Sequence, residues 1–168
     1  ENIKNLVSFS LNIKLKNLTL YALSSENFHR SSLDLIYDII YKNFSKYFED
    51  LVVDNDVKIK IFGSRKNLPN KILDIFENIE KLSLNNNTLN LNIAFNYGFK
   101  DEIKKVLKKV KDNSLEIDLN NEQEIDKLFD IGKFPDPDIL IRTGGYKRLS
   151  NFIMYNLTYT ELFFTDTL

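Results

Sequence analysis

Apolar residues recur along the chain at two alternating spacings, one typical of strands and the other of helices. Short apolar runs or period-two alternation predict strands at residues 18–23, 57–62, 88–98, 139–141 and 161–165. Spacings of three and four predict helices at residues 2–13, 33–53, 69–84, 100–111 and 122–131, and another that begins near Ser150. Strands that alternate with helices are typical of α/β folds. We therefore expect a mostly parallel central sheet flanked by helices.

All four arginines lie just after predicted strands: Arg30, Arg65, Arg142 and Arg148. The other 19 of the 23 Lys and Arg residues are lysine. Since lysine is the usual cation of this chain, we expect each arginine to be present for the geometry of its guanidinium group. Ligands of parallel sheets bind outside the carboxyl ends of the strands. We predict that the arginines share one rim of the sheet, with a plain turn residue as the open alternative for Arg65.

The stretch "ILIRTGGYKRLSNF", residues 139–152, carries the clearest chemistry. Guanidinium groups match phosphate oxygens two at a time. Gly144 and Gly145 allow a sharp turn with exposed backbone N–H groups, and a helix that begins at Ser150 would favour an anion at its N-terminus. These features predict a phosphate or diphosphate site, with a solvated glycine turn as the alternative. No Walker sequence and no G-x-G-x-x-G motif is present, which argues against a nucleotide.

Composition narrows the classes of function. A chain of 168 residues predicts a single domain, residues 1–168. The net charge of −1 argues against a general nucleic-acid-binding protein. The absence of cysteine excludes disulfides and thiolate metal sites, and His29, the single histidine, argues against a histidine-ligated zinc site. No apolar run approaches the roughly 18 residues of a membrane span.

Carboxylates also cluster near the predicted rim: Glu26, Asp136, Asp138, Glu161 and Asp166. Magnesium is usually held by one or two carboxylates together with substrate phosphates. Asp136 and Asp138 flank a proline before a strand, so we interpret them as structural. From the residues alone, Glu161 is interpreted as a surface residue rather than a metal ligand.

Two further groups of residues allow more than one interpretation. Leu89, Leu91, Ile93 and Phe95 share one strand face, which forms either core or the wall of an apolar cleft. The loop "SSENFHR" places Ser24, Ser25 and Asn27 after a buried strand, several residues before any helix cap is needed. A diphosphate rim beside an apolar cleft would suit a lipid diphosphate.

Three segments then identify a family. "LTLYALSSENFHR", "LNLNIAFNYG" and "PDPDILIRTGGYKRLSNFIMYNLTYTELFFTDTL" resemble the signature segments of cis-prenyltransferases, such as undecaprenyl and dehydrodolichyl diphosphate synthases. The resemblance covers nearly the whole chain. It implies an α/β enzyme that condenses isopentenyl diphosphate in cis with an allylic diphosphate, such as farnesyl diphosphate, into a long polyprenyl diphosphate of the dolichol or undecaprenol type. It also implies magnesium, a homodimer, no nucleic acid and a possible place at the membrane periphery.

The resemblance assigns roles to individual residues. It implies catalytic roles for Ser24 and Asn27, the latter in removing a proton from the incoming unit. The implied substrate-binding residues are Ser25, Glu26, Phe28, Arg30, Arg142, Arg148, Leu149 and Ser150. Ala22, Leu89, Ile93 and Phe95 correspond to the hydrophobic tunnel for the growing chain. Glu161 corresponds to a glutamate that assists magnesium, which reverses the interpretation from the residues alone.

The chain departs from the family pattern in several places. It has no "MDGNGRWA"-like segment, which holds the principal metal-binding aspartate, and it ends before a "WPDF"-like sequence. Tyr146 replaces a glutamate or glutamine, Tyr155 a tryptophan, and Phe95 a small residue. We expect that the N-terminal strand is missing and that these residues alone are inactive.

Two other functions remain as alternatives. One is a non-catalytic partner subunit of a heteromeric cis-prenyltransferase, and the other is a phosphate-ester enzyme of a different α/β family. The retained Asn27, Arg142, Arg148, Ser150 and Glu161 favour the catalytic role. The sequence leaves the compartment open between the cytoplasm and a membrane periphery, such as the endoplasmic reticulum or a plastid-like organelle.

Overall fold

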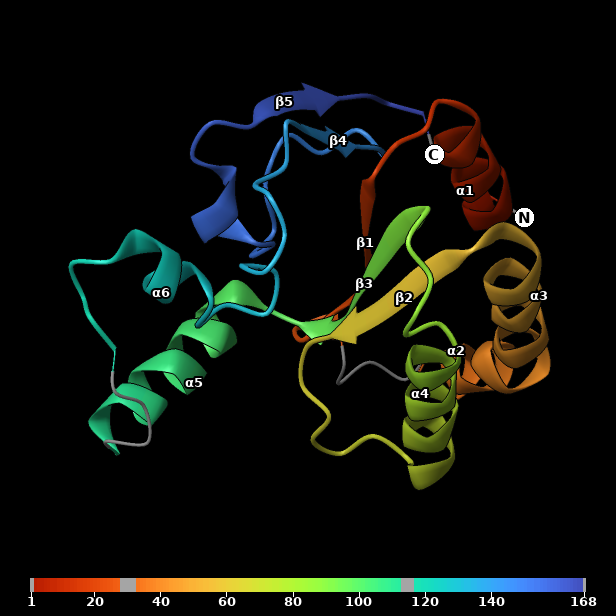
Figure 1. Cartoon of the computed structure of the whole chain (residues 1–168), viewed down its shortest axis with the longest axis horizontal. Coiled ribbons are helices and arrows are strands. Elements are labelled where there is room, and N and C mark those ends of the chain that lie inside the picture. Colours follow the sequence, from red (N-terminus) through yellow and green to blue (C-terminus); the bar gives the residue numbers. More distant parts are fainter. Residues whose placement is uncertain (1, 28–32, 113–116, 168) are drawn as a thin grey trace. The chain divides into compact units, whose positions relative to one another are not determined.

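The computed structural model describes residues 2–27, 33–112 and 117–167 (Figure 1). The chain divides into two compact units, Glu1–Asn96 and Tyr97–Leu168. Each unit is treated by itself below. The prediction of one domain over residues 1–168 stays a prediction.

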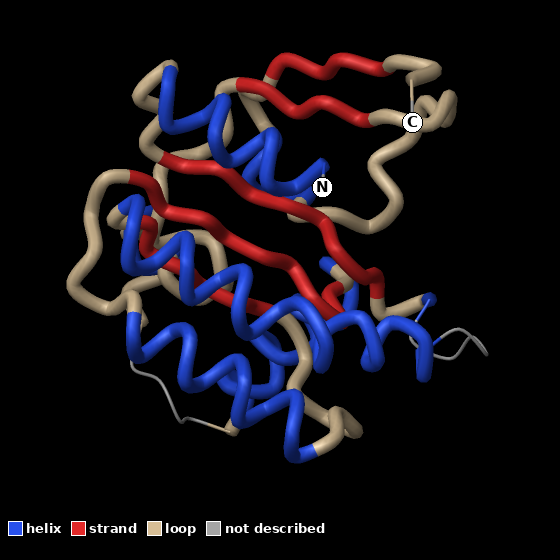
Figure 2. Tube along the Cα trace, turned by 90° about the vertical axis from the view of Figure 1, so that its right-hand side faces the viewer, coloured by secondary structure: helices blue, strands red, loops and turns tan. Residues whose placement is uncertain are grey.

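A three-stranded sheet forms the centre of the first unit. Its strands are β1 (Asn17–Ser24), β2 (Val57–Phe62) and β3 (Leu89–Tyr97), in the order β1-β3-β2 (Figure 1). Figure 2 draws the strands in red and the helices in blue. β2 and β3 pair in parallel, from Val57 opposite Leu89 to Phe62 opposite Ala94. The β-branched and aliphatic residues predicted all three strands within about two residues, a normal error at element ends.

Helices α1 (Asn2–Asn12), α2 (Leu33–Ile39), α3 (Ser45–Asn55) and α4 (Asn70–Leu82) complete this unit. The prediction of one continuous helix over residues 33–53 was wrong, because a π-helical segment, η2 (Ile40–Phe44), separates α2 from α3. A π turn adds a residue without removing the apolar positions on either side. Ile40 and Phe48 therefore still reach the core, and helical spacing alone did not reveal the interruption.

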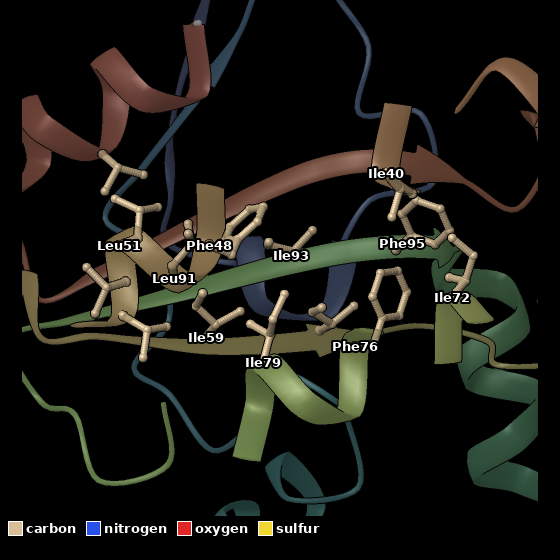
Figure 3. Packing of buried hydrophobic residues seen from close by; sticks show 14 of the residues in the cluster. Ile40, Phe48, Leu51, Ile59, Ile72, Phe76, Ile79, Leu91, Ile93 and Phe95 are labelled. Carbon is tan, nitrogen blue, oxygen red and sulfur yellow. The ribbon is translucent and has the colours of Figure 1, made fainter. Parts of the chain in front are cut away.

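The core lies between the sheet and the helices of this unit (Figure 3). Phe76 of α4 meets Phe95 of β3 edge to face, with ring centroids 5.2 Å apart. Alternation in residues 88–98 predicted one buried face, yet β3 is buried along almost its whole length, including the polar Asn92 and Asn96. β3 is the middle strand of the sheet, and a middle strand is readily covered on both faces.

The second unit contains a two-stranded parallel sheet. Its elements are α5 (Phe99–Lys111), α6 (Glu122–Asp126), β4 (Ile139–Arg142), η3 (Met154–Leu157) and β5 (Glu161–Phe164). β4 and β5 pair in parallel, from Ile139 opposite Glu161 to Arg142 opposite Phe164. The predicted α/β class with parallel pairing is confirmed. The strands of the described residues, however, form two sheets and not the single sheet that was predicted. The prediction failed here because an apolar run indicates a strand but does not indicate which strand pairs with it.

Two helix predictions in this unit need correction. The predicted helix at 122–131 ends at Asp126, and Phe129 beyond it is buried, where it stacks on Tyr155 with ring centroids 4.2 Å apart. No helix begins at Ser150, because Ser150 and Asn151 adopt φ values of 49° and 62° in the left-handed region. Successive residues in that region cannot start a right-handed helix.

Candidate active site

The turn after β4 is clamped to the segment that follows β5. Gly144 donates its backbone N–H to the carbonyl of Thr167 at 2.8 Å, and Gly145 donates to that of Thr165 at 3.0 Å. Thr165 in turn donates to the carbonyl of Arg142 at 3.0 Å. The prediction that the glycines expose their N–H groups was therefore wrong, since both groups bond within the protein.

The glycines serve the shape of the turn. Gly144 and Gly145 have φ values of 84° and 77°, which side-chain-bearing residues rarely adopt. A Cβ atom on Gly145 would also lie 3.3 Å from Oδ1 of Asp166. The double glycine thus fixes a tight turn that directs residues 146–150.

Two guanidinium groups and a hydroxyl gather on this turn. Arg142 donates from Nη1 to Oγ of Ser150 at 2.6 Å and also to the carbonyl of Arg148. The ring of Tyr146 has Cζ of Arg148 4.6 Å and Cζ of Arg142 5.8 Å from its centroid. Arg142 and Arg148 thus lie together beside Ser150, and the half-buried Leu149 separates Arg148 from Ser150 in the sequence. The predicted rim shared by all four arginines stays a prediction.

Among the described residues, no carboxylate forms an ion pair with Arg142 or Arg148. Ion pairs do form at Lys42, Lys60, Arg65, Lys104 and Lys105. The described partners of Arg142 and Arg148 are instead a hydroxyl, a carbonyl and an aromatic face. Two positive charges held by uncharged groups form an arrangement suited to an anion with several oxygens. We name the Arg142, Tyr146, Arg148 and Ser150 side chains the guanidinium cluster.

Arg65 has a different environment. Its Nη2 donates to the carbonyl of Ile61 at 2.9 Å and to Oε2 of Glu80 at 3.1 Å. Its Cζ lies 5.1 Å from the ring centroid of Phe76. The alternative interpretation of Arg65, a residue that stabilises the turn after β2, is the one that this geometry favours.

The loop after β1 is described as far as Asn27. Asn27 donates its backbone N–H to Oγ of Ser24 at 3.2 Å, which closes a turn at the strand end. Ser24, Ser25 and Asn27 are half-buried, and Glu26 is exposed.

Nearby Tyr21 is partly buried in β1. Its pKa is raised to about 12, first by burial and then by the charge of Glu26, while a hydrogen bond with Ser24 opposes the rise. Phe28, Arg30 and His29 lie outside the described residues, so their predicted roles stay predictions.

The residues predicted to line a tunnel are found in two environments. Leu89, Ile93 and Phe95 are 0%, 3% and 5% exposed and belong to the core of the first unit. Ala22 of β1 is exposed. The packing fits the core interpretation of the strand face, and the tunnel role stays a prediction.

Glu161 and the guanidinium cluster occupy opposite ends of the two-stranded sheet. Glu161 opens β5 opposite Ile139, three residue pairs before Arg142 and Phe164. At about 3.3 Å per residue, this separates Glu161 from Arg142 by roughly 10 Å along the strands. Asp136 accepts a hydrogen bond from Nδ2 of Asn156 at 2.9 Å, as expected of a structural residue. The described residues contain no group of three or more His, Cys, Asp or Glu side chains arranged for a metal.

Sequence reasoning missed two polar residues of the second unit, Glu102 and Asn151. Glu102 of α5 is buried. Its carboxylate accepts a hydrogen bond from the hydroxyl of Tyr97 at 2.5 Å and another from the backbone N–H of Asp130 at 2.6 Å. Burial raises the pKa of the Glu102 carboxyl, and these two hydrogen bonds oppose the rise. The second residue is Asn151. The one sequence signal for its role is that asparagine adopts left-handed backbone conformations more readily than most residues.

The chain is similar to known proteins along its whole length. The family model for undecaprenyl diphosphate synthase matches residues 1–168. The tritrans,polycis-undecaprenyl-diphosphate synthase of Pyrobaculum aerophilum, specific for geranylgeranyl diphosphate, is 34% identical over 174 residues, which span 100% of this chain and 73% of that protein.

Two solved structures share the fold. One is that of a probable undecaprenyl diphosphate synthase from Campylobacter jejuni, with a TM-score of 0.85 and 28% identity, covering 99% of this chain and 79% of that one. The other is lavandulyl diphosphate synthase from Lavandula x intermedia in complex with dimethylallyl diphosphate, with a TM-score of 0.84 and 32% identity, covering 99% and 75%. Across the described helices, none has the length and apolar character to cross a bilayer. By its sequence and its fold, the chain belongs to the undecaprenyl diphosphate synthase family of cis-prenyltransferases.

Proposed function

We propose that this protein condenses isopentenyl diphosphate in cis with an allylic diphosphate to make a long-chain polyprenyl diphosphate. The guanidinium cluster is the observation that carries the proposal. It offers two forked cations and a hydroxyl, which match the several oxygens of a diphosphate better than the two oxygens of a carboxylate. Relatives with this activity and a related structure holding an allylic diphosphate support the same reaction class.

In this proposal the guanidinium cluster binds isopentenyl diphosphate. Arg142 and Arg148 each present part of a planar fork, and Ser150 supplies a hydroxyl already oriented by Arg142. The described hydrogen bonds of Arg142 use Nη1, while a guanidinium carries five N–H donors in all. The diphosphate then anchors the unit so that its double bond is held for attack, which lowers the entropic part of the barrier.

The loop after β1 serves the reacting carbons. The allylic carbon–oxygen bond breaks, the diphosphate leaves with the bonding electron pair, and the double bond of the isopentenyl unit forms the new carbon–carbon bond. A proton is then lost from the isopentenyl unit to the released diphosphate, which is a stronger base than an amide or a hydroxyl, and Ser24 and Asn27 would assist this transfer. The hydrogen bond between these two residues closes a turn at the end of β1. Phe28 and Arg30 are assigned to the allylic substrate, and Ser25 and Glu26 to substrate binding.

Magnesium is part of the proposal, and Glu161 would hold it together with substrate phosphates. An exposed carboxylate is a hard oxygen donor of the kind magnesium prefers, and one or two such groups suffice when phosphates supply the rest. When bound, the ion would stabilise the negative charge that develops on the leaving diphosphate. We also propose a homodimer and leave the product length and the compartment open.

The test is incorporation of labelled isopentenyl diphosphate into polyprenyl diphosphate by the full-length protein, with farnesyl diphosphate as the acceptor. Arg142→Ala and Arg148→Ala should each lower kcat/KM for isopentenyl diphosphate by about 100-fold, since each removes a charged donor. Lys147→Ala removes an exposed cation from the same turn and is the matched control, expected to change little.

Three results would point elsewhere. Undiminished incorporation by both arginine variants would refute the site. Binding of isopentenyl diphosphate without transfer, together with stimulation of a second subunit, would select the partner-subunit alternative. Phosphatase activity without prenyl transfer would select the other α/β enzyme class.

A further inference from the structure

Helix α5 receives its N-terminal cap from a residue far along the chain. The residue before the helix, Gly98, has no side chain that could cap it. Asn151 supplies the cap instead, 51 residues beyond Lys100. Its Oδ1 accepts the backbone N–H of Lys100 at 2.9 Å, and its backbone carbonyl accepts that of Phe99 at 2.9 Å. Two N–H groups that a helix start leaves without helical partners are thus bonded to one asparagine.

The same asparagine belongs to a strained pair beside the guanidinium cluster. Ser150 and Asn151 both have left-handed φ values, 49° and 62°. Asparagine adopts this region fairly readily, but serine does so much less often, so the surroundings must hold Ser150 there. On one side the hydroxyl of Ser150 is held by Arg142, and on the other Asn151 is held by α5.

Helix α5 is itself a firm support for this pair. Glu102 in its first turn is bonded to Tyr97 and Asp130, and the ring of Tyr97 packs edge to face on Phe152 with centroids 6.2 Å apart. The residue after Asn151 is therefore anchored beside the helix start as well. Asn151 is thus bonded to the start of α5, and the ring of the next residue packs on Tyr97 just before that helix.

We propose that Asn151 is a positioning residue for isopentenyl diphosphate. By capping α5 it fixes the left-handed pair, and the pair in turn sets where the Ser150 hydroxyl meets the Arg142 guanidinium. Asn151 acts through these two groups and need not touch the substrate. This inference rests on the proposed function, because it takes the guanidinium cluster as the site for isopentenyl diphosphate.

Two substitutions in the full-length protein separate the parts of this role. Asn151→Gly keeps the left-handed backbone and removes the side-chain cap, whereas Asn151→Ala removes the cap and disfavours the backbone as well. Asn121→Ala is the matched control, since Asn121 caps α6 by accepting the backbone N–H of Gln123 at its Oδ1 at 3.1 Å. Binding of isopentenyl diphosphate and of inorganic diphosphate is measured by calorimetry, with KM for both substrates and amide exchange at Lys100.

We expect Asn151→Ala to weaken binding of both diphosphates by about tenfold and Asn151→Gly by about threefold, as cap and backbone losses imply. Exchange of the Lys100 amide should be faster in both variants, and KM for the allylic diphosphate should stay unchanged. The Asn121 control should match the wild type in all of these measurements.

Wild-type affinity in both Asn151 variants, or an equal loss for both substrates, would overturn the inference. If Asn151→Ala does not fold, the glycine variant decides by the same criteria. A wild type that binds inorganic diphosphate but not isopentenyl diphosphate, with binding weakened in the variants, would refute the proposed function and support the positioning role. A wild type that binds neither would refute both.

Discussion

Two arginines follow parallel strands in this protein and are held in opposite ways. Arg65, after β2, donates to the carboxylate of Glu80 and lies against Phe76. Arg142, at the end of β4, donates to the hydroxyl of Ser150 and lies near the ring of Tyr146. A carboxylate neutralises the charge it holds, while a hydroxyl and a ring orient a guanidinium and leave its charge available. The difference separates a structural arginine from one suited to an anionic ligand.

The largest effect should come from Arg142→Lys, which keeps the charge and removes the fork. We expect kcat/KM for isopentenyl diphosphate to fall by about 30- to 100-fold, because an ammonium group cannot bond two phosphate oxygens and Ser150 in the same geometry. Steady-state kinetics of the full-length protein measure this loss. The matched change Arg65→Lys should leave kcat/KM within about twofold. Equal losses in the two variants would remove the distinction between the arginines.

Next in size is the loss of stability from Glu80→Ala. Besides Arg65, Glu80 accepts the backbone N–H of Ile61 at 2.8 Å and the ammonium group of Lys60 at 3.2 Å. Leaving a largely buried strand N–H without its acceptor should lower the free energy of unfolding by about 2 kcal/mol. Urea unfolding measures the change, and affinity for isopentenyl diphosphate per folded molecule should persist. Loss of affinity without loss of stability would contradict the structural role.

The pH dependence of stability tests whether the buried carboxyl group of Glu102 is free of any ion pair with the arginines of the guanidinium cluster. Burial raises the pKa of Glu102 above its ordinary value of 4.5. The folded protein therefore binds this proton more tightly than the unfolded chain does. The associated stability is present below pH 4.5 and is lost as the pH rises through the raised pKa.

Glu102→Gln should remove this component of the pH dependence. Urea unfolding of the wild type and the variant measures the difference in the free energy of unfolding. The measurements run from about pH 4, near the ordinary pKa of a carboxyl group, to about pH 7. A carboxylate paired with an arginine would show the reverse slope, with stability gained as the pH rises. That outcome would mean that Glu102 resembles Glu80 instead of standing apart from the cluster.

The smallest effect should come from Tyr146. Its ring contributes a cation–π contact at an exposed site, which is typically worth about 0.5–1 kcal/mol. Tyr146→Ala should raise Kd for isopentenyl diphosphate by about two- to fivefold, whereas Tyr146→Phe retains the ring face and should match the wild type. Isothermal calorimetry distinguishes these outcomes. An equal loss in Tyr146→Phe would show that the hydroxyl, and not the ring, supports the cluster.

Local pattern predicted much of this fold. The run from Val57 to Phe62 became β2 without a change of bounds, because alternating β-branched residues leave few competing conformations. Pro69 was expected in the first turn of a helix and precedes α4 directly. The predictions failed where backbone geometry depends on distant contacts, as at the π segment of residues 40–44 and the left-handed Ser150.

The candidate site shows the same division. Arg142, Arg148 and Ser150 were identified from the sequence because they lie within nine residues and carry the right donors for a diphosphate. The role of Asn151 was not identified, since its partner Lys100 lies 51 residues away and Gly98 gave no sign of an external cap.

The sequence by itself determined the α/β class, the positions of the strands and of most helices within a few residues, the family, and the residue types that a diphosphate needs. The family rests on the resemblance of whole segments, and the other properties follow from side-chain chemistry and from spacing over a few residues. Only the tertiary structure decided that Arg65 bonds Glu80 while Arg142 bonds Ser150, and that the glycine N–H groups bond the segment after β5. The physical reason is that the partner of a polar group is chosen by which distant segment folding brings within hydrogen-bond distance, and local sequence does not encode that choice.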